Sequence, residues 1–590
     1  MDKIKTLTGS IEGLHIEKIV LSEPFIDFSA RFSSTPGTVV LLSGGALDCA
    51  RHHILAAKPW LSFVGRGHDM VISIGDQNIH FEADPFETLR KLLNTFSFDQ
   101  HILPLDPTLP VASGLFGYLS YDLKDHLEKL PRTSIDDLCL PQICLFAPSI
   151  VVVHDKIKKS TYLCVPERVL PGGSNLDVDL EAFEKIITSD PPGKTSFSGD
   201  AGGFRSNFEK KNYMDSIEQV KEYIASGHVY QVNMSQRFEM GFEGSAFGLF
   251  QTLYNNNPAP FFAFIQAGDH QIVSTSPERF ILKTGNRVET RPIKGTRPRG
   301  NSPEQDKRLC RELMESRKDD AELSMIVDLL RNDLGKVCEG GTVRVTEHKR
   351  LEAYRNVYHL VSVVEGTLDR RFDSVDLITA TFPGGIAIRT ATIVNNRIIF
   401  SAGGGIVFDS NPGDEFDETL HKGGTLMEAF QGDETKSHKH TFAWINGTIK
   451  PTEQVKIPVT DLGFQYGYGF FETIRVDKGK PKFLDEHTER FNRAWKQLFF
   501  QPPPDLSWNE IIDQVITRNG FRERTVAVKI IATKGDRDDP PFNNTLMVTS
   551  HPYTHRLAGK KDPGLHILTY PEPRQTPLAD HKTLNYLYYF

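Results

Sequence analysis

Apolar residues follow a helical spacing in some parts of the chain and form short continuous runs in others. Residues 213–226 carry apolar side chains three or four apart, and Gly227 follows them, which predicts a helix that ends there. Apolar runs at 261–266, 271–274 and 397–402 predict strands. Because these elements mix without a regular strand–helix–strand alternation, the pattern indicates an α+β fold with largely antiparallel sheet.

Two polar stretches interrupt this pattern. Residues 189–207 are rich in Pro, Gly and Ser, which predicts a long loop that separates an amino-terminal part (1–190) from a second part (206–430). Residues 431–441 are almost wholly polar, which is typical of an interdomain linker, so we expect a further domain over 442–590.

The composition excludes several functional classes. The 68 Lys and Arg residues and 76 Asp and Glu residues are interspersed, so the clustered basic surface of a nucleic-acid-binding protein is not expected. No apolar run reaches the ~18–20 residues of a membrane span, and the first twenty residues lack the apolar core of a signal peptide. Six scattered cysteines match neither a zinc site nor a disulfide scaffold. We therefore expect a cytoplasmic, multidomain protein, with enzyme as the leading class.

The clearest predicted helix runs from Ser316 to Gly335, with Ser316 as its N-cap. Glu322 falls on the same face as Met325, Ile326 and Leu329. A carboxylate on an apolar face requires a partner. The residues alone leave two interpretations open: a buried ion pair or cap, and a metal ligand or general acid–base.

A second acidic helix is predicted to begin near Gly413, with Glu415, Glu418 and Lys422 able to share one face. A solvated helix face is the ordinary explanation. Three glycines, 403–405, precede this helix and are expected to follow a strand. Their backbone N–H groups could bind an anion, and a bend or bulge is the alternative.

Lys294 lies between Pro292 and Gly295, which together restrict the local backbone. His359 stands alone in a later apolar run. Most lysines are solvated and a single histidine is usually structural, so neither residue is decisive by itself.

Several motifs in order resemble the chorismate-utilising enzymes over most of residues 1–430. The lysine of the 292–296 motif is typical of the aminodeoxychorismate synthase component I branch, whereas anthranilate synthases usually have alanine there. The motifs are YQVN at 230–233, SPERF at 276–280, PIKGT at 292–296, AELSMIVDLLRNDLG at 321–335, YHLVS at 358–362, IAIRT at 386–390 and AGGGIVFDS at 402–410.

The resemblance implies a fold of antiparallel sheets packed as a sandwich with outer helices, and it implies roles for particular residues. Glu322 and Glu418 would bind Mg²⁺ at the ring carboxylate of chorismate. Lys294 would act as a nucleophile, and His359 would act near the leaving hydroxyl. The implied substrate-binding residues are Thr296, Arg389, Gly403, Gly404, Gly405 and Lys422.

Partners are implied in the same way. Residues 42–45 and 114–118 resemble the segments around the family's tryptophan pocket and its partner-binding face, so the resemblance implies tryptophan as a ligand of the amino-terminal region. No nucleophilic cysteine with a partner histidine is evident, so ammonia is expected from a separate glutamine amidotransferase subunit.

The chain departs from the family pattern after Gly385. In the family, a further motif, a helix and a strand precede the segment that matches 386–390, whereas here Gly385 leads directly into Ile386. Roughly forty residues at ordinary element lengths are expected to be missing. Such a loss predicts unpaired strand edges and exposed apolar surface.

The last 150 residues carry a second set of motifs. FQYGYGFFET at 464–473 and HTERF at 487–491 resemble the fold-type IV, class IV pyridoxal-phosphate enzymes, which include aminodeoxychorismate lyase. The resemblance implies that Arg490 binds the cofactor phosphate and that Lys582 forms the Schiff base. Family members continue for about half a domain beyond the position of Phe590, so we expect a partial domain here.

Together these features predict an aminodeoxychorismate synthase component I joined to an aminodeoxychorismate lyase-like domain, which would place two steps of para-aminobenzoate and folate synthesis on one chain. Anthranilate synthase component I is the nearest alternative. A catalytically inactive ligand- or partner-binding remnant is the alternative from another class.

Overall fold

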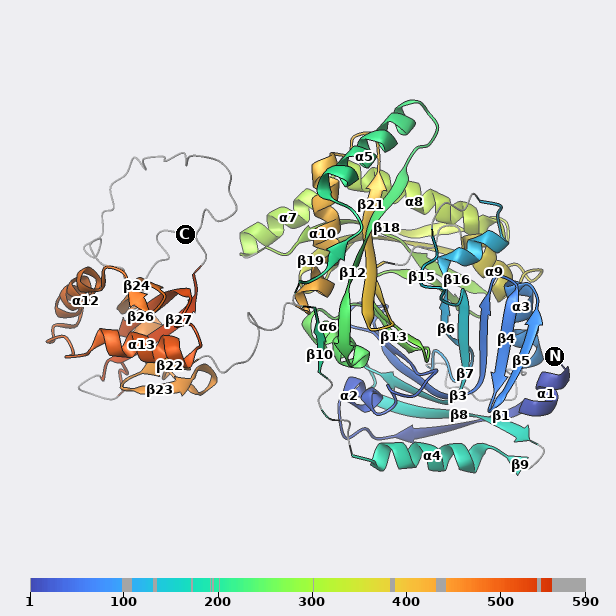
Figure 1. Cartoon of the computed structure of the whole chain (residues 1–590), viewed down its shortest axis with the longest axis horizontal. Helices are drawn as coiled ribbons and strands as arrows, with labels where there is room; N and C mark the ends of the chain where they lie inside the picture. Colours follow the sequence, from blue (N-terminus) through green and yellow to red (C-terminus); the bar gives the residue numbers. More distant parts are fainter. Residues whose placement is uncertain are drawn as a thin grey trace. The chain divides into compact units, whose positions relative to one another are not determined.

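The computed structural model contains two compact units, 1–431 and 432–590. We describe each unit by itself. Helix and strand labels follow Figure 1. The structure describes residues 2–97, 109–130, 135–170, 173–190, 193, 196–200, 202–300, 302–382, 388–430, 442–538 and 543–553.

A large antiparallel sheet forms the framework of the first unit. Its main path runs β1-β8-β7-β3-β2-β13-β14-β20-β21-β12-β10, so strands from the amino-terminal part and from the later part of the unit join in one sheet where β2 pairs with β13. The strands are β1 Ser10–Ile19, β2 Val39–Leu42, β3 His52–Arg66, β4 Asp69–Ile74, β5 Gln77–Glu82, β6 Phe116–Leu119, β7 Ile143–Asp155, β8 Ser160–Leu170, β9 Gly173–Ser174, β10 Phe197–Gly199, β11 Arg205–Ser206, β12 Val232–Gly244, β13 Phe261–Gln266, β14 His270–Ser276, β20 Thr390–Val394 and β21 Arg397–Ile406.

A second antiparallel sheet of five strands carries much of the predicted chemistry. Its path is β15-β16-β19-β17, and β18 pairs with the other edge of β19 along part of its length. The strands are β15 Arg279–Thr284, β16 Arg287–Arg291, β17 Ile293–Pro298, β18 Arg344–Ala353 and β19 Val357–Thr367. The helices of the unit are α1 Asp2–Thr8, α2 Phe25–Ala30, α3 Pro85–Thr95, η2 Tyr121–His126, α4 Leu176–Thr188, α5 Lys210–Ala225, α6 Ala246–Asn256, α7 Pro303–Glu315, α8 Arg317–Gly335, α9 Ser374–Thr381 and α10 Pro412–Glu428.

The main apolar core joins the two parts that the sequence separated at 189–207. It contains Phe32 and Phe183 from the first part and Phe250, Phe264 and Phe400 from the second. The expected loop also contains the short strands β10 and β11, which pair with β12. The two parts therefore share this core, because side chains far apart in sequence bury their apolar surface together.

Local patterns predicted several elements closely. The helix expected over 213–226 is α5, which ends before Gly227 at a φ of 76°. The runs at 261–266, 271–274 and 397–402 lie in β13, β14 and β21. The pairings within both sheets are antiparallel, so the α+β prediction is confirmed.

The second unit is one antiparallel sheet with helices. Its order is β23-β22-β27-β26-β24-β25, and its core includes Phe470, Phe491, Trp495 and Trp508. The expected linker, 431–441, lies outside the described residues. The elements are β22 Phe442–Ile445, β23 Thr448–Pro451, η4 Thr452–Gln454, α11 Leu462–Tyr466, β24 Gly469–Asp477, β25 Lys480–Pro481, α12 Leu484–Phe499, α13 Trp508–Arg518, β26 Thr525–Thr533 and β27 Thr545–Pro552.

Candidate active site

Lys294 lies in β17, paired with Leu360 of β19. The register shifts between Lys294 and Thr296, and Gly295 between them has a φ of 75°. A Cβ on Gly295 would stand 2.9 Å from Leu313 Cδ1, so only glycine fits this bulge without displacing its neighbours. The bulge sets the direction of the half-buried Lys294 side chain.

Glu278 is a site residue that the sequence reasoning did not single out. Its Oε1 accepts a 2.9 Å hydrogen bond from the backbone N–H of Ile293, next to Lys294. Burial raises the pKa of Glu278, while the Ile293 N–H and the charge of Lys294 act to lower it. A carboxylate thus lies close to the Lys294 amine. The SPERF motif at 276–280 contains Glu278 and could have indicated it. Only the fold shows that Glu278 lies beside the backbone next to Lys294.

His359 is buried on β19, at 2% exposure. Its Nδ1 lies 3.0 Å from Thr296 Oγ1, and the ring of Tyr354 meets it edge to face at 4.9 Å. Burial, and after it the charge of Arg389, lower the pKa of His359 to about 4. Its Nε2 is buried without a hydrogen-bond partner among the described residues. The neutral ring therefore presents one free nitrogen, which requires a partner.

Arg389 stands immediately before β20, with a φ of 49°. Burial lowers the pKa of Arg389, and the charge of Arg389 lowers the pKa of His359. Within the described part of the chain, no acidic side chain forms an ion pair with its guanidinium. A half-buried cation of this kind is a binding group for an anionic ligand.

Helix α8 supports Glu322 and agrees with the predicted N-cap, since Ser316 Oγ accepts a 3.2 Å hydrogen bond from the Asp319 N–H. Burial raises the pKa of Glu322. The charge of Lys294 lowers it and that of Glu418 raises it. Lys294, Glu322 and Glu418 are thus close enough to act on one another electrostatically.

The apolar face of α8 differs from the prediction. The residues that face the core are Leu323, Val327 and Leu330, whereas Met325 and Leu329 are 38% and 46% exposed. Periodicity found two apolar rows on this helix and could not tell which one the fold covers. Glu322 lies on the row that is not packed in the core.

The three glycines 403–405 lie inside β21, so the prediction that they follow a strand was wrong, as was the alternative of a bend or bulge. Residues Gly403, Gly404 and Gly405 pair in regular register with Ser235, Met234 and Asn233 of β12. Their small size serves close packing instead. A Cβ on Gly404 would stand 3.1 Å from Glu415 Oε2 and 3.8 Å from Lys422 Nζ.

Helix α10 brings its acidic face to these glycines (Figure 1). Glu415 is buried and accepts a 2.8 Å hydrogen bond from Ser410 Oγ. Glu418 forms a 2.7 Å ion pair with Lys422, whose Nζ also donates to the Gly403 carbonyl at 2.9 Å. The predicted shared face of Glu415, Glu418 and Lys422 therefore points to β21.

Among the described residues, no group of three or more His, Cys, Asp or Glu side chains could hold a metal ion. The electrostatically coupled pair Glu322 and Glu418 still fits Mg²⁺, because this ion is commonly held by one or two carboxylates and completed by substrate oxygens and water.

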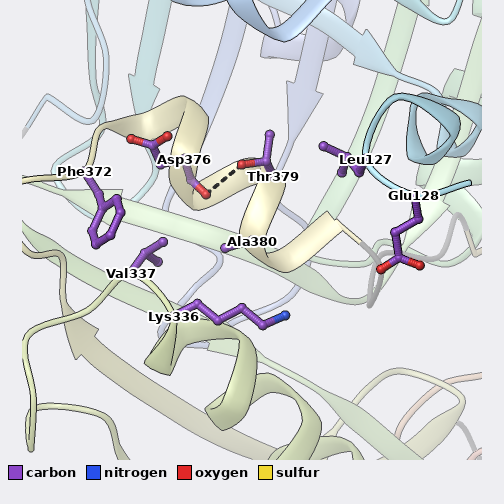
Figure 2. Close-up of a pocket in the computed structure, with 8 residues that line it drawn as sticks. All are labelled: Leu127, Glu128, Lys336, Val337, Phe372, Asp376, Thr379 and Ala380. Atoms are coloured by element: carbon purple, nitrogen blue, oxygen red, sulfur yellow. Dashed lines mark hydrogen bonds between the residues drawn. The ribbon is translucent and has the colours of Figure 1, made fainter.

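A separate cavity of about 380 Å³ lies between the end of α8 and α9 (Figure 2). Two of its ionic groups already have partners: Lys336 Nζ lies 2.7 Å from Asp333, and Asp376 lies 2.9 Å from Arg90. None of the predicted site residues lines this cavity. It is therefore not the site that the sequence predicts.

The amino-terminal segment 42–45 is held by Lys156, whose Nζ donates to the carbonyls of Ser43, Gly45 and Ala50 at 2.6, 2.8 and 2.9 Å. On the same loop Asp48 pairs with Arg291 of β16 at 2.9 Å. These contacts anchor the expected tryptophan-pocket segment to the five-stranded sheet.

In the second unit, Arg490 lies on α12 and is bound by Glu472 of β24. Nε and Nη2 of Arg490 donate to the two carboxylate oxygens at 2.7 and 2.6 Å, and His487 Nδ1 lies 2.8 Å from Glu472 Oε2. Among the described residues, no hydrogen bond or ion pair involves Nη1 of Arg490. Arg490 thus fits a phosphate through that nitrogen. Lys582 lies outside the described residues.

The sequence of the first unit matches the model of the chorismate binding enzyme family, in two stretches, 52–385 and 385–428. The chain belongs to the chorismate binding enzyme family. Residues 469–590 match amino-transferase class IV, so this family member carries a class IV domain, as predicted.

Curated relatives include two kinds of enzyme at equal identity. Anthranilate synthase component 1 of Cereibacter sphaeroides is 32% identical, and the alignment covers 66% of this chain and 87% of the relative. Aminodeoxychorismate synthase component 1 of Bacillus subtilis is also 32% identical to this chain, and the alignment covers 65% of this chain and 89% of the relative. The enzyme of the same name from Salmonella typhimurium is 32% identical, and that alignment covers 68% of this chain and 95% of the relative.

Solved structures support the fold. Anthranilate synthase component I from Streptococcus pneumoniae aligns with a TM-score of 0.56 at 25% identity and covers 65% of this chain and 94% of that one. The Escherichia coli isochorismate synthase MenF aligns with a TM-score of 0.52 at 14% identity, covering 73% and 97%. The predicted fold and enzyme class are confirmed. No helix in the described residues is both long enough and apolar enough to cross a membrane.

The alignments also contain a gap. The one with the S. typhimurium relative is 448 positions long but includes 68% of this chain, about 401 of its 590 residues. About 47 positions of that alignment therefore have no residue in this chain. The two matched stretches of the family model meet at residue 385.

Proposed function

We propose that the first unit is an aminodeoxychorismate synthase component I. It converts chorismate and ammonia to 4-amino-4-deoxychorismate, with ammonia delivered by a glutamine amidotransferase subunit. The observation that carries this proposal is Lys294, a lysine on β17 whose charge acts on two carboxylates, Glu278 and Glu322.

This arrangement supports nucleophilic catalysis by Lys294. An amine attacks only when it is unprotonated, and Glu278 or Glu322 can accept its proton. The amine adds to C2 of chorismate as the C4 hydroxyl departs, and ammonia then adds at C4 as the lysine leaves C2. The chain thereby returns to its starting state.

The remaining groups suit a dianionic substrate. Arg389 is a half-buried cation that no acidic side chain of the described residues pairs with, so it can pair with a carboxylate of the substrate. His359 has one free buried nitrogen and a pKa of about 4, so its neutral ring can hydrogen-bond the leaving hydroxyl. Thr296 holds the other ring nitrogen, and the strand at 403–405 with Lys422 forms the adjoining wall.

Glu322 and Glu418 are the residues that would hold Mg²⁺, which neutralises a substrate carboxylate when bound. Lys422 now neutralises Glu418 at 2.7 Å. A bound cation would therefore compete with Lys422 for this carboxylate.

Anthranilate synthase is the second candidate, because relatives with that activity are equally identical. Lys294 argues against it, since the resemblance places alanine at this position in that branch.

The test is incubation of the full chain with chorismate, Mg²⁺ and ammonium, followed by chromatographic identification of the product. Aminodeoxychorismate is the expected product. If the product is anthranilate, the first unit is an anthranilate synthase component I and the proposal is wrong. If the chorismate is unchanged, the chain is an inactive binding protein.

For the second unit we propose an aminodeoxychorismate lyase-like role with pyridoxal phosphate. When bound, this cofactor supplies an electron sink for bond cleavage. Arg490 would hold its phosphate, and Lys582 would hold its aldehyde carbon covalently. Borohydride treatment with saturating cofactor is expected to label wild type at Lys582 and to leave Lys582→Ala unlabelled. An unlabelled wild type would overturn this role.

A further inference from the structure

The turn between β18 and β19 places Tyr354 beside His359. Glu352, near the end of β18, lies directly opposite His359 of β19, and Thr296 of β17 lies opposite His359 on the other side. Residues opposite one another in neighbouring strands project from the same face of a sheet. His359 is therefore the centre of a row of three side chains from three strands, and Tyr354 follows Glu352 by two residues.

The backbone of Tyr354 is held on both sides. Its N–H donates to the Val357 carbonyl at 2.8 Å, and its own carbonyl accepts a 3.2 Å hydrogen bond from Arg299 Nη1. Because the first of these bonds closes the turn between two strands, a shift of Tyr354 would open the hairpin.

The side chain of Tyr354 is fixed at its hydroxyl. The hydroxyl donates a 3.1 Å hydrogen bond to Oε2 of Glu352, which is buried at 4% exposure. Burial, and after it the charge of Glu352, raise the pKa of Tyr354, so the phenol keeps the proton that it donates. The other Glu352 oxygen accepts a hydrogen bond from Arg350, which Asp48 binds in turn at 3.2 Å. The acceptor of the Tyr354 hydroxyl is thus itself held in place by ion pairs.

The ring of Tyr354 restricts the imidazole of His359. The two ring centres are 4.9 Å apart and the ring planes cross at 80°, which is an edge-to-face contact. On the imidazole, Nδ1 lies 3.0 Å from Thr296 Oγ1 and 3.4 Å from the Gly295 carbonyl oxygen. Since a carbonyl oxygen only accepts, the Gly295 contact favours a proton on Nδ1 and leaves Nε2 as an acceptor.

Nε2 of His359 is the atom that these contacts leave available. It is buried and has no hydrogen-bond partner among the described residues. Half a turn of the ring about the Cβ–Cγ bond would put Cε1 in the place of Nε2 and would break the Nδ1 contacts. The charge of Arg389 acts on both His359 and Tyr354, so both rings lie near the same proposed binding group for the substrate.

We propose that Tyr354 is a positioning residue for His359. Its ring holds the imidazole in the orientation that presents Nε2 to the substrate, and the hydrogen bond to Glu352 keeps the Tyr354 ring in that place. This role rests on the proposed function, in which His359 meets the leaving hydroxyl of chorismate.

The test compares three variants of the full chain. Tyr354→Phe keeps the ring and removes the hydroxyl, and Tyr354→Leu removes the ring. The control is Tyr223→Leu, which removes an exposed ring that meets His228 edge to face elsewhere in the unit. Two quantities are measured. The first is kcat and KM with chorismate, ammonium and Mg²⁺, and the second is the pKa of His359, from the pH dependence of hydrogen–deuterium exchange at its Cε1, followed by mass spectrometry.

Tyr354→Leu is expected to lower kcat at least about 30-fold while KM changes less than about threefold, because a misdirected imidazole affects the reacting step more than binding. The pKa of His359 is expected to rise from about 4 by at least about one unit, because loss of the ring admits water to the imidazole. Tyr354→Phe is expected to keep the wild-type pKa of His359 and a kcat within about threefold of wild type. Tyr223→Leu should change neither quantity. Should Tyr354→Leu fail to fold, Tyr354→Met replaces it, since its flexible side chain fills irregular space.

For an active chain, the two quantities must change together in the variant without the ring. A lower melting temperature with unchanged kcat and unchanged His359 pKa would show that Tyr354 is only structural, and a change in kcat or in the pKa alone would equally overturn the proposal. An equal loss in Tyr354→Phe would overturn it too, because that variant keeps the ring. The proposed function can fail separately. If wild type makes anthranilate, kcat for that product gives the same comparison, and if it makes no product, the pKa of His359 in the variants decides whether Tyr354 holds the ring.

Discussion

At the scale of single residues, His359 makes the stability of the folded chain depend on pH. In the unfolded chain a histidine titrates near 6.5, whereas burial and Arg389 lower the pKa of His359 to about 4 in the folded chain. Between these values the unfolded chain binds more protons than the folded chain. The contribution of His359 to the free energy of unfolding is therefore fully present above pH 6.5 and is lost as the pH falls towards 4. The contribution is about 3 kcal/mol at most.

We predict that His359→Gln reduces the slope of unfolding free energy against pH between 6.5 and 4, measured by urea denaturation. The exposed His228 supplies the control variant, His228→Gln, which should keep the wild-type slope. A wild-type slope in His359→Gln would show that this ring is not a buried neutral histidine.

Sequence reasoning proposed Lys294, Glu322, His359 and Arg389 as members of one site. In the structure the charge of Lys294 acts on Glu278 and Glu322, and the charge of Arg389 acts on His359. It missed Glu278 and Tyr354. Their roles depend on contacts across β15–β19 that no local pattern encodes.

At the scale of elements, β24 and α12 are joined by a buried ion pair. Glu472 is 3% exposed and binds Arg490 through both oxygens, with His487 as a further partner. Removing its charge would leave two donors without their acceptor, at a cost of about 2 kcal/mol.

We predict that Glu472→Gln destabilises the second unit by about this amount, whereas Glu489→Gln, an exposed change on α12, does not. Three of the four tryptophans, Trp444, Trp495 and Trp508, lie in this unit, so denaturation followed by tryptophan fluorescence reports on it. Equal stability of the two variants would contradict a structural role for the pair.

Periodicity located α5, α8 and β13 because each has a clear apolar pattern. It misread residues 403–405, because glycines carry no side-chain pattern and their strand is defined by pairing with β12, about 170 residues away. It also chose the exposed row of α8, because Leu323 and Met325 are equally apolar and only the packing of the sheet distinguishes them.

At the scale of the whole molecule, the chain is a chorismate binding enzyme followed by a class IV aminotransferase domain. The sequence suggested a division at 189–207, and the large sheet and the main apolar core contain residues from both sides of it. Such long-range pairing follows from burial of the whole set of strands and cannot be read from one polar stretch.

We propose that Lys294 makes this chain an aminodeoxychorismate synthase. The most direct measurement compares wild type with Lys294→Ala on chorismate, ammonium and Mg²⁺, with the product identified by chromatography and folding checked by circular dichroism. We predict aminodeoxychorismate from wild type and a loss of at least about 100-fold in that product from the folded variant. Equal aminodeoxychorismate from both proteins would contradict the account.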